Sequence, residues 1–126
     1  MKALAAVLLL SGCASMSEVP KAEYAWQALL LVDAGQTIQI AQHRECYYED
    51  NPVTHRVIGR HPDVLPVVAW MLGMSALHYA ITMSLEERDV PPWVRSGWQM
   101  LTIGKSVDTV AHNYDIGLSP TGASCP

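Results

Sequence analysis

The stretch VLPVVAWMLGMSALHYAITMSL, residues Val64 to Leu85, contains no Asp, Glu, Lys or Arg. At a rise of ~1.5 Å per residue, a helix of this length is about as long as the hydrocarbon core of a bilayer is thick. The segments on either side are more polar, so they are expected to cover this helix or to accompany it. The stretch is therefore either a membrane span or the buried centre of a small helical bundle.

The amino terminus resembles the signal of a bacterial lipoprotein. Lys2 precedes an apolar run over residues 3–10, which is too short to cross a bilayer and is typical of a secretory signal. Small residues then lead to Cys13, the position that carries the lipid and begins the mature chain in such proteins. We predict a cleaved signal at residues 1–12, palmitate on Cys13 and a tether over residues 13–21. The alternative is an ordinary signal followed by a cysteine without lipid.

Composition narrows the class of protein. Half of the 126 residues are hydrophobic, with six Met and four Trp but no Phe, and the formal net charge is −4. The sequence has no basic cluster that would bind a phosphate backbone, so nucleic acid is not an expected partner. No run alternates between apolar and polar residues at the period of a strand. We expect a single, almost entirely helical domain over residues 22–126.

Three helices are expected, and together they form an all-α, three-helix bundle. Apolar residues at helical spacing cover about 22–43 and 93–115, on either side of the helix at about 64–85. Small residues recur along the last two helices and predict that other helices approach them closely. These are Ala69, Gly73, Ala76 and Ala80 in one helix and Gly97, Gly104 and Ala111 in the other. The segment 44–62 is expected to be a packed loop, and the tail after Gly117 a loop as well.

A polar layer in the middle of the bundle is the first candidate site. If the helices run up, down and up, Asp33 and Lys105 lie at nearly the same depth, and His78 comes within about one turn of them, ~5 Å. Such a layer is either a proton site or an ion pair that fixes the register of the helices. We favour the ion pair.

The second candidate surrounds the loop 44–62, where side chains of the types that bind metals are frequent. They are His43, Glu49, Asp50, Asn51, His55, His61 and Asp63. Their spacing matches no established zinc pattern, so we expect a hydrogen-bonded loop with no metal or other cofactor. Asn51 before Pro52 predicts a turn, in which Glu49 accepts hydrogen bonds from backbone amides. Asp63 is expected to cap the helix that follows.

A third pattern suggests a resemblance to other proteins. Its residues are Asp33-x-x-Gln36-Thr37, then Glu49-x-Asn51-Pro52, and later Asn113 and Gly117. The pattern resembles small helical membrane proteins or lipoproteins of unknown function from bacteria and phages. The resemblance implies three helices and a place in the cell envelope, and it brings no activity with it. Where such proteins have a compact Asn-Pro-x-x-Gly turn, this chain has extra residues before Gly59.

We therefore expect a lipid-anchored envelope protein that binds a partner, such as another envelope protein, or occupies the membrane, with no catalytic residues. No hydrolase, nucleotide-binding or metalloprotease motif is present in the sequence. The rival hypothesis is a small membrane enzyme or ion-handling protein that uses Asp33, Glu49, His78 and His112. A third hypothesis is a phage-encoded exclusion or lysis-related lipoprotein.

The two remaining cysteines bear on which side of the membrane the domain lies. An up, down, up bundle leaves Cys46 and Cys125 at the same end. If the domain lies on the periplasmic side, both thiols are in an oxidising space and should form a disulfide. If the helices span the inner membrane instead, both thiols are cytoplasmic and reduced. We favour the extracytoplasmic, disulfide-bonded form.

Overall fold

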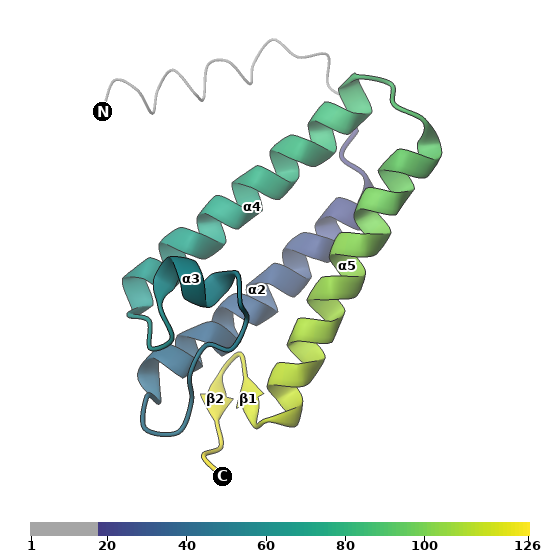
Figure 1. Cartoon of the computed structure of the whole chain (residues 1–126). Coiled ribbons are helices and arrows are strands. Elements are labelled where there is room, and N and C mark those ends of the chain that lie inside the picture. Colours follow the sequence, from purple (N-terminus) through teal and green to yellow (C-terminus); the bar gives the residue numbers. More distant parts are fainter. Residues whose placement is uncertain (1–17) are drawn as a thin grey trace, which may run out of the picture.

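The computed structural model describes residues 18–126, which form four helices and one small hairpin (Figure 1). The elements are α2 (Lys21–Gln42), α3 (Thr54–Ile58), α4 (Val64–Glu87), α5 (Pro92–Asp115), β1 (Leu118–Ser119) and β2 (Gly122–Ala123). The prediction of an all-α domain is confirmed, and the three long helices begin and end within two residues of the expected bounds. The predicted signal and Cys13 lie outside the described residues.

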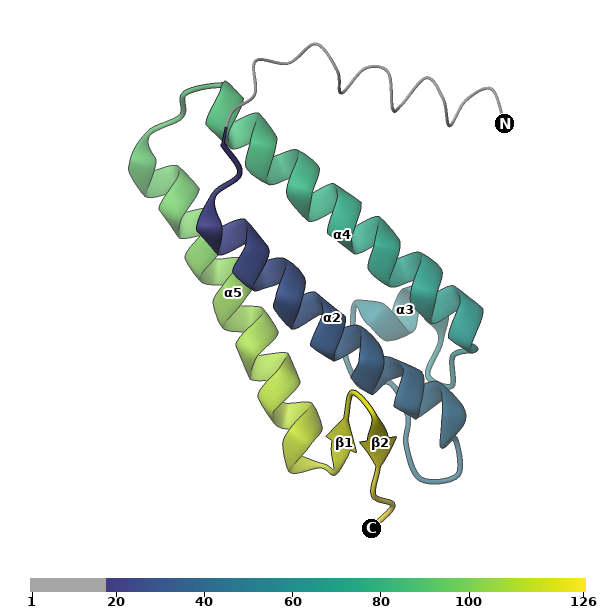
Figure 2. The same ribbon diagram turned by 180° about the vertical axis from the view of Figure 1, so that it is seen from behind.

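Helix α2 lies between α4 and α5 and packs against both, whereas α4 and α5 contact each other little. Their polar contacts lie near the turn that connects them, where the Thr82 hydroxyl accepts hydrogen bonds from Trp98 Nε1 at 3.0 Å and Gln99 Nε2 at 3.1 Å. Away from this turn the two helices diverge, as both views show (Figures 1 and 2). The bundle is therefore open along one side.

The apolar helix α4 is not the buried centre of the bundle, because α2 has that place. Within residues 18–126, α4 is the one helix long and apolar enough to cross a membrane, and 17% of its most apolar 18-residue window is buried. Leu65 and Leu72 on this helix are 77% and 66% exposed. The structure therefore leaves much of the apolar surface of α4 uncovered.

The small residues of α4 and α5 do not make the close helix contacts that were predicted. Ala69, Gly73, Ala76 and Ala80 are exposed, and a Cβ added to Gly73, Gly97 or Gly104 would have no neighbour within 4 Å. On α4, the larger side chains of Val67 and Met71 make the contact with α2 instead, where they pack with Ala41. The prediction is therefore wrong for the described residues. The small residues do recur at helical spacing, but the face that they occupy points outward.

The start of α4 also differs from expectation. Asp63 has the extended backbone of a capping residue, but its side chain makes no capping hydrogen bond. Its carboxylate pairs with Arg44, whose Nη2 also donates to the Pro62 carbonyl at 2.9 Å. The Asp63 carboxylate therefore pairs with the guanidinium of the preceding loop and does not cap the helix.

The tail after α5, predicted to be a loop, forms the antiparallel hairpin β1–β2, with Leu118 paired to Ala123. Leu118 is fully buried and packs with Ile40 and Tyr47. The hairpin lies so close to α2 that a Cβ on Gly35 would be 2.8 Å from the Pro120 Cβ. Only glycine fits there without a shift of the backbone.

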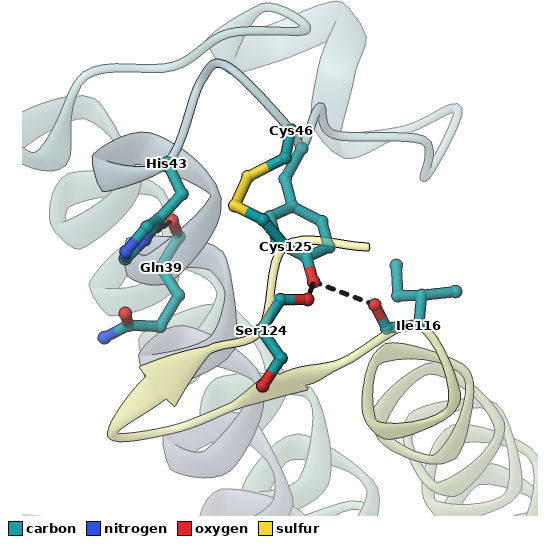
Figure 3. The surroundings of a disulfide bond; sticks show 7 residues. Gln39, His43, Cys46, Ile116, Ser124 and Cys125 are labelled. Atoms are coloured by element: carbon teal, nitrogen blue, oxygen red, sulfur yellow. Dashed lines mark hydrogen bonds between the residues drawn. A yellow bond between two sulfur atoms is a disulfide. The ribbon is translucent and has the colours of Figure 1, made fainter.

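A disulfide joins Cys46 to Cys125, with the two Cα atoms 5.6 Å apart (Figure 3). Beside it the Tyr47 hydroxyl is hydrogen-bonded to the carbonyl oxygens of Ile116, at 2.9 Å, and Ser124. The loop after α2 is thus fixed to the hairpin at the end of the bundle where the sequence placed both cysteines.

Candidate functional site

A mostly apolar groove of about 370 Å³ lies between α4 and α5. Three of the four tryptophans of the chain line it, one from each long helix: Trp26 of α2, Trp70 of α4 and Trp98 of α5. Leu77 and Leu101 also line the groove and are 55% and 77% exposed. Its volume falls within the range of small-molecule sites, ~300–1,000 Å³. The groove exists because α4 and α5 diverge on either side of α2.

An acidic pocket of about 230 Å³ adjoins the groove, at the end away from the α4–α5 turn. It is lined by acidic side chains from α2, α5 and the loop, with one lysine and one histidine among them: Asp33, Glu49, Asp50, Asp108, Lys105 and His112. Asp33, Asn51 and Lys105 line both the pocket and the groove. The two cavities are therefore neighbours with a common wall.

Asp33 is hydrogen-bonded to the side chain of Asn113, which is itself bonded to Gln36. Asn113 Nδ2 donates to Asp33 Oδ1 at 3.2 Å and to Gln36 Oε1 at 3.1 Å. Gln36 is fully buried, and its Nε2 donates to the carbonyls of Val110 and Leu118, each at 3.3 Å. Burial raises the pKa of Asp33 from 3.8 to about 6, although the bond from Asn113 acts in the opposite direction.

Glu49 is positioned by the turn that the sequence predicted. Its Oε1 accepts a hydrogen bond from the Asn51 amide at 2.8 Å, while Asn51 Oδ1 accepts from the amides of Val53 and Thr54 at 3.0 and 3.3 Å at the start of α3. The prediction that Glu49 accepts from a backbone amide of this turn is confirmed. The residue is only 5% exposed. Burial raises the pKa of Glu49 from 4.5 to about 7, and the charges of Asp33 and Asp50 add to the increase.

A buried network centred on Glu23 and His78 forms the other end of the groove. Glu23 is 1% exposed and accepts hydrogen bonds from His78 Nδ1 at 2.8 Å, Thr82 Oγ1 at 2.7 Å and Gln27 Nε2 at 2.7 Å. The imidazole of His78 stacks on Trp26, with 3.6 Å between ring centroids, and on Trp98, with 4.8 Å. Its Nε2 is 3.0 Å from the Thr102 hydroxyl. The network therefore links all three long helices.

The protonation of this pair follows from burial and hydrogen bonding. Burial alone would raise the pKa of Glu23, but the donors Thr82 and Gln27 and the nearby His78 lower it overall. Burial lowers the pKa of His78 by more than the Glu23 carboxylate raises it. The stable form at neutral pH is a carboxylate beside a neutral imidazole, with the Nδ1–H of the imidazole donating to Glu23.

The ion pair expected between Asp33 and Lys105 is not formed. The Lys105 side chain is 71% exposed and pairs with Asp108 at 3.4 Å, while His78 bonds to Glu23. The depth of these residues along the helix axes was predicted well, since Asp33, His78 and Lys105 all line one groove. Depth alone, however, does not fix the direction in which each side chain points. The predicted layer is therefore replaced by two separate polar clusters.

The metal-type side chains around the loop are dispersed. His112 Nε2 lies 3.0 Å from Asp50 Oδ2, and His43 Nδ1 lies 2.9 Å from the Gln39 carbonyl. His61 and Asp63 are exposed, and His55 is in α3. Within residues 18–126, the one group at metal-ligand spacing is Glu45 with Cys46 and Cys125. The disulfide removes both thiolates from that group.

Glu23 was not predicted as a site residue from the sequence, because an acid in the first turn of a helix is common. It lies three and seven residues before Trp26 and Leu30. An acid on the apolar stripe of a helix signals a buried partner, and this spacing was the available clue.

No family model matches the chain, and neither the curated proteins nor the solved structures contain a significant match to it.

Proposed function

We propose that the chain is a lipid-anchored protein of the bacterial cell envelope whose helical domain binds a small, partly apolar ligand in the groove between α4 and α5. The observation that supports this most strongly is the groove itself, in which three tryptophans from three helices surround a space that the chain leaves open. Apolar surface that is covered contributes about 25 cal/mol per Å², so a ligand that fills the groove gains affinity from its walls.

The buried network supports a binding role over a catalytic one. His78 is 3% exposed, lies between two indoles and is bonded through both ring nitrogens to Glu23 and Thr102. With the imidazole neutral, the Thr102 hydroxyl donates to His78 Nε2, and the Trp98 carbonyl at 2.9 Å is the alternative acceptor for the same proton. Groups that are fully engaged with one another form a rigid wall, and rigid walls favour affinity because little freedom is lost on binding.

The proposed address rests on the lipoprotein-like signal and on the cysteines. A disulfide between Cys46 and Cys125 is compatible with an oxidising space such as the periplasm. The eight steps of chain from Cys13 to Lys21 can span at most ~30 Å, so the first turn of α2 must stay near the membrane that carries the lipid. Glu23 in this turn is bonded to Thr82 near the end of α4, so that end of α4 stays near the membrane as well.

We further assign the exposed apolar face of α4 to contact with the surface of the same bilayer. Leu65 and Leu72 lie on this helix and are largely exposed. A lipid chain and an apolar helix face together make a stable attachment, whereas a single chain gives a marginal one. The helix would then lie on the membrane while the groove faces its other side.

The binding role is tested by filling the groove. Ser106 lines the groove on α5, and Ser106→Phe should weaken the binding of a neutral apolar fluorophore, N-phenyl-1-naphthylamine, by about tenfold or more. The control is Ala111→Phe, on the exposed surface of the same helix, which should leave the affinity unchanged. Both variants are compared as the mature chain without lipid. Equal affinities for the wild type and Ser106→Phe would contradict the proposed site.

A further inference from the structure

The acidic pocket contains two carboxylates that have no cationic partner within the described residues. Lys105 is paired with Asp108, and His112 with Asp50. Lys105 and His112 are the two basic side chains that line the pocket, and both are therefore already paired. Asp33 and Glu49, the two more deeply placed acids, take part in no ion pair of residues 18–126.

Each of these two carboxylates also has an oxygen without a donor. Glu49 is only 5% exposed. Its Oε1 accepts a hydrogen bond from the Asn51 amide, but no hydrogen bond from residues 18–126 reaches Oε2. Asp33 likewise receives Asn113 at Oδ1 and nothing at Oδ2. Both oxygens are reachable from the pocket that the two residues line, so a ligand or solvent can supply the donor that the described residues do not. An ammonium group carries three donors and a positive charge, which is the complement of this pair.

The pocket opens into the apolar groove at Asp33 and Asn51, which line both. A ligand can therefore place a charged group beside Asp33 and extend an apolar chain between α4 and α5. The chain would run toward Trp98 and the buried network around His78. A ligand with a charge at one end and an apolar body matches this division of the surface.

Building on the proposed binding function, we infer that the ligand is an amphiphilic amine, with its ammonium group between Asp33 and Glu49 and its apolar chain along the groove. The ammonium donates to the unbonded carboxylate oxygens and supplies the cationic partner that Lys105 and His112, paired with Asp108 and Asp50, do not provide for Asp33 and Glu49. Burial already raises the pKa of both carboxyls, and a bound cation would reverse that shift. Binding is therefore expected to strengthen as pH rises and the two carboxyls ionise.

Three probes that contain eight carbons each and carry different polar groups test this inference: octylammonium, octanol and octanoate. Binding to the mature chain is followed by tryptophan fluorescence at about pH 8, where both carboxyls are ionised. The background from Trp93, which does not line the groove, is removed with Trp93→Phe. We expect octylammonium to bind about tenfold or more tightly than octanol, and octanoate to bind weakest.

Two variants separate the pocket from the general charge of the protein. The double variant Asp33→Asn and Glu49→Gln should abolish the preference for octylammonium over octanol while leaving octanol binding unchanged. The control, Glu87→Gln with Asp89→Asn, removes two exposed acids at the end of α4 and in the α4–α5 turn, away from the pocket, and should keep the preference.

The possible failures are distinguishable. If octanol binds as tightly as octylammonium, or octanoate binds more tightly, the ligand is not a cation, and the proposed binding function stands without this inference. If the preference survives in the double variant, the charge is recognised elsewhere and the inference is wrong. If none of the three probes binds, the proposed binding function fails together with the inference.

Discussion

Asp33 and Glu49 make the stability of the domain depend on pH. Their pKa values are raised from 3.8 to about 6 and from 4.5 to about 7, so the folded state binds these protons more tightly than the unfolded state does. Their contribution to stability is therefore greatest below pH ~4 and is lost as pH rises through ~6–7. Together they should lower the free energy of unfolding by roughly 4–6 kcal/mol across this range.

Urea unfolding at about pH 5 and pH 8 checks this dependence. The double variant Asp33→Asn and Glu49→Gln should lose less stability than the wild type between these two values. His78 titrates with the opposite sign, because its lowered pKa costs stability as pH falls, but it is present in both proteins and cancels in the comparison. Equal losses in the two proteins would show that the two carboxyls are not buried as described.

At the scale of residues, local chemistry was predictable and long-range pairing was not. The turn at Asn51-Pro52 follows from backbone preferences of neighbours, so the role of Glu49 could be predicted. The partner of Glu23 is 55 residues away in the sequence, and nothing local indicates it. The predicted partner of Lys105, Asp33, was wrong. Asp108 lies three residues along the same exposed helix face and is closer than an acid on another helix.

At the scale of elements, α4 gives the molecule its second attachment to the membrane in our proposal. Metabolic labelling with a palmitate analogue should mark the wild type and leave Cys13→Ser unmarked. Part of the Cys13→Ser protein should remain in the membrane fraction because of the α4 face. Adding Leu72→Glu, a charge at a position 66% exposed, should release it without lowering the melting temperature.

The matched control for this experiment is Thr121→Glu, an exposed position in the hairpin turn, which should leave the fractionation of Cys13→Ser unchanged. Complete release of Cys13→Ser without any second change would show that α4 contributes nothing. Labelling of Cys13→Ser at the level of the wild type would contradict the lipid anchor.

The bounds of the long helices were predictable because proline and charge mark them. Pro91 and Pro92 start α5, where a missing amide donor has no cost, and charged residues follow the apolar run of α4. The hairpin was not predictable, because its strands have two residues each. It is stabilised by contacts distant in sequence, namely burial of Leu118 against Ile40 and the disulfide at Cys125.

At the scale of the whole molecule, the two ends of the bundle are held in different ways. Near the α4–α5 turn, the network of Glu23, His78 and Thr82 links the three long helices. At the other end, the disulfide closes a loop with a sequence separation of 79 residues and stabilises the fold by roughly 4–5 kcal/mol in the chain-entropy model. The network, which links α4 to α2 and α5, preorganises the end of the groove that it forms, and this favours binding.

In our proposal, ligands bind in the groove between α4 and α5. The most direct test follows the four indole N–H signals in a ¹H–¹⁵N spectrum of the mature chain during titration with octanol, the neutral probe whose binding does not depend on the acidic pocket. Trp26, Trp70 and Trp98 line the groove, whereas Trp93 is 76% exposed outside it and serves as an internal control. We expect shifts at Trp26, Trp70 and Trp98 with Trp93 unmoved. Shifts at Trp93 alone, equal shifts at all four signals, or no shift would contradict binding in the groove.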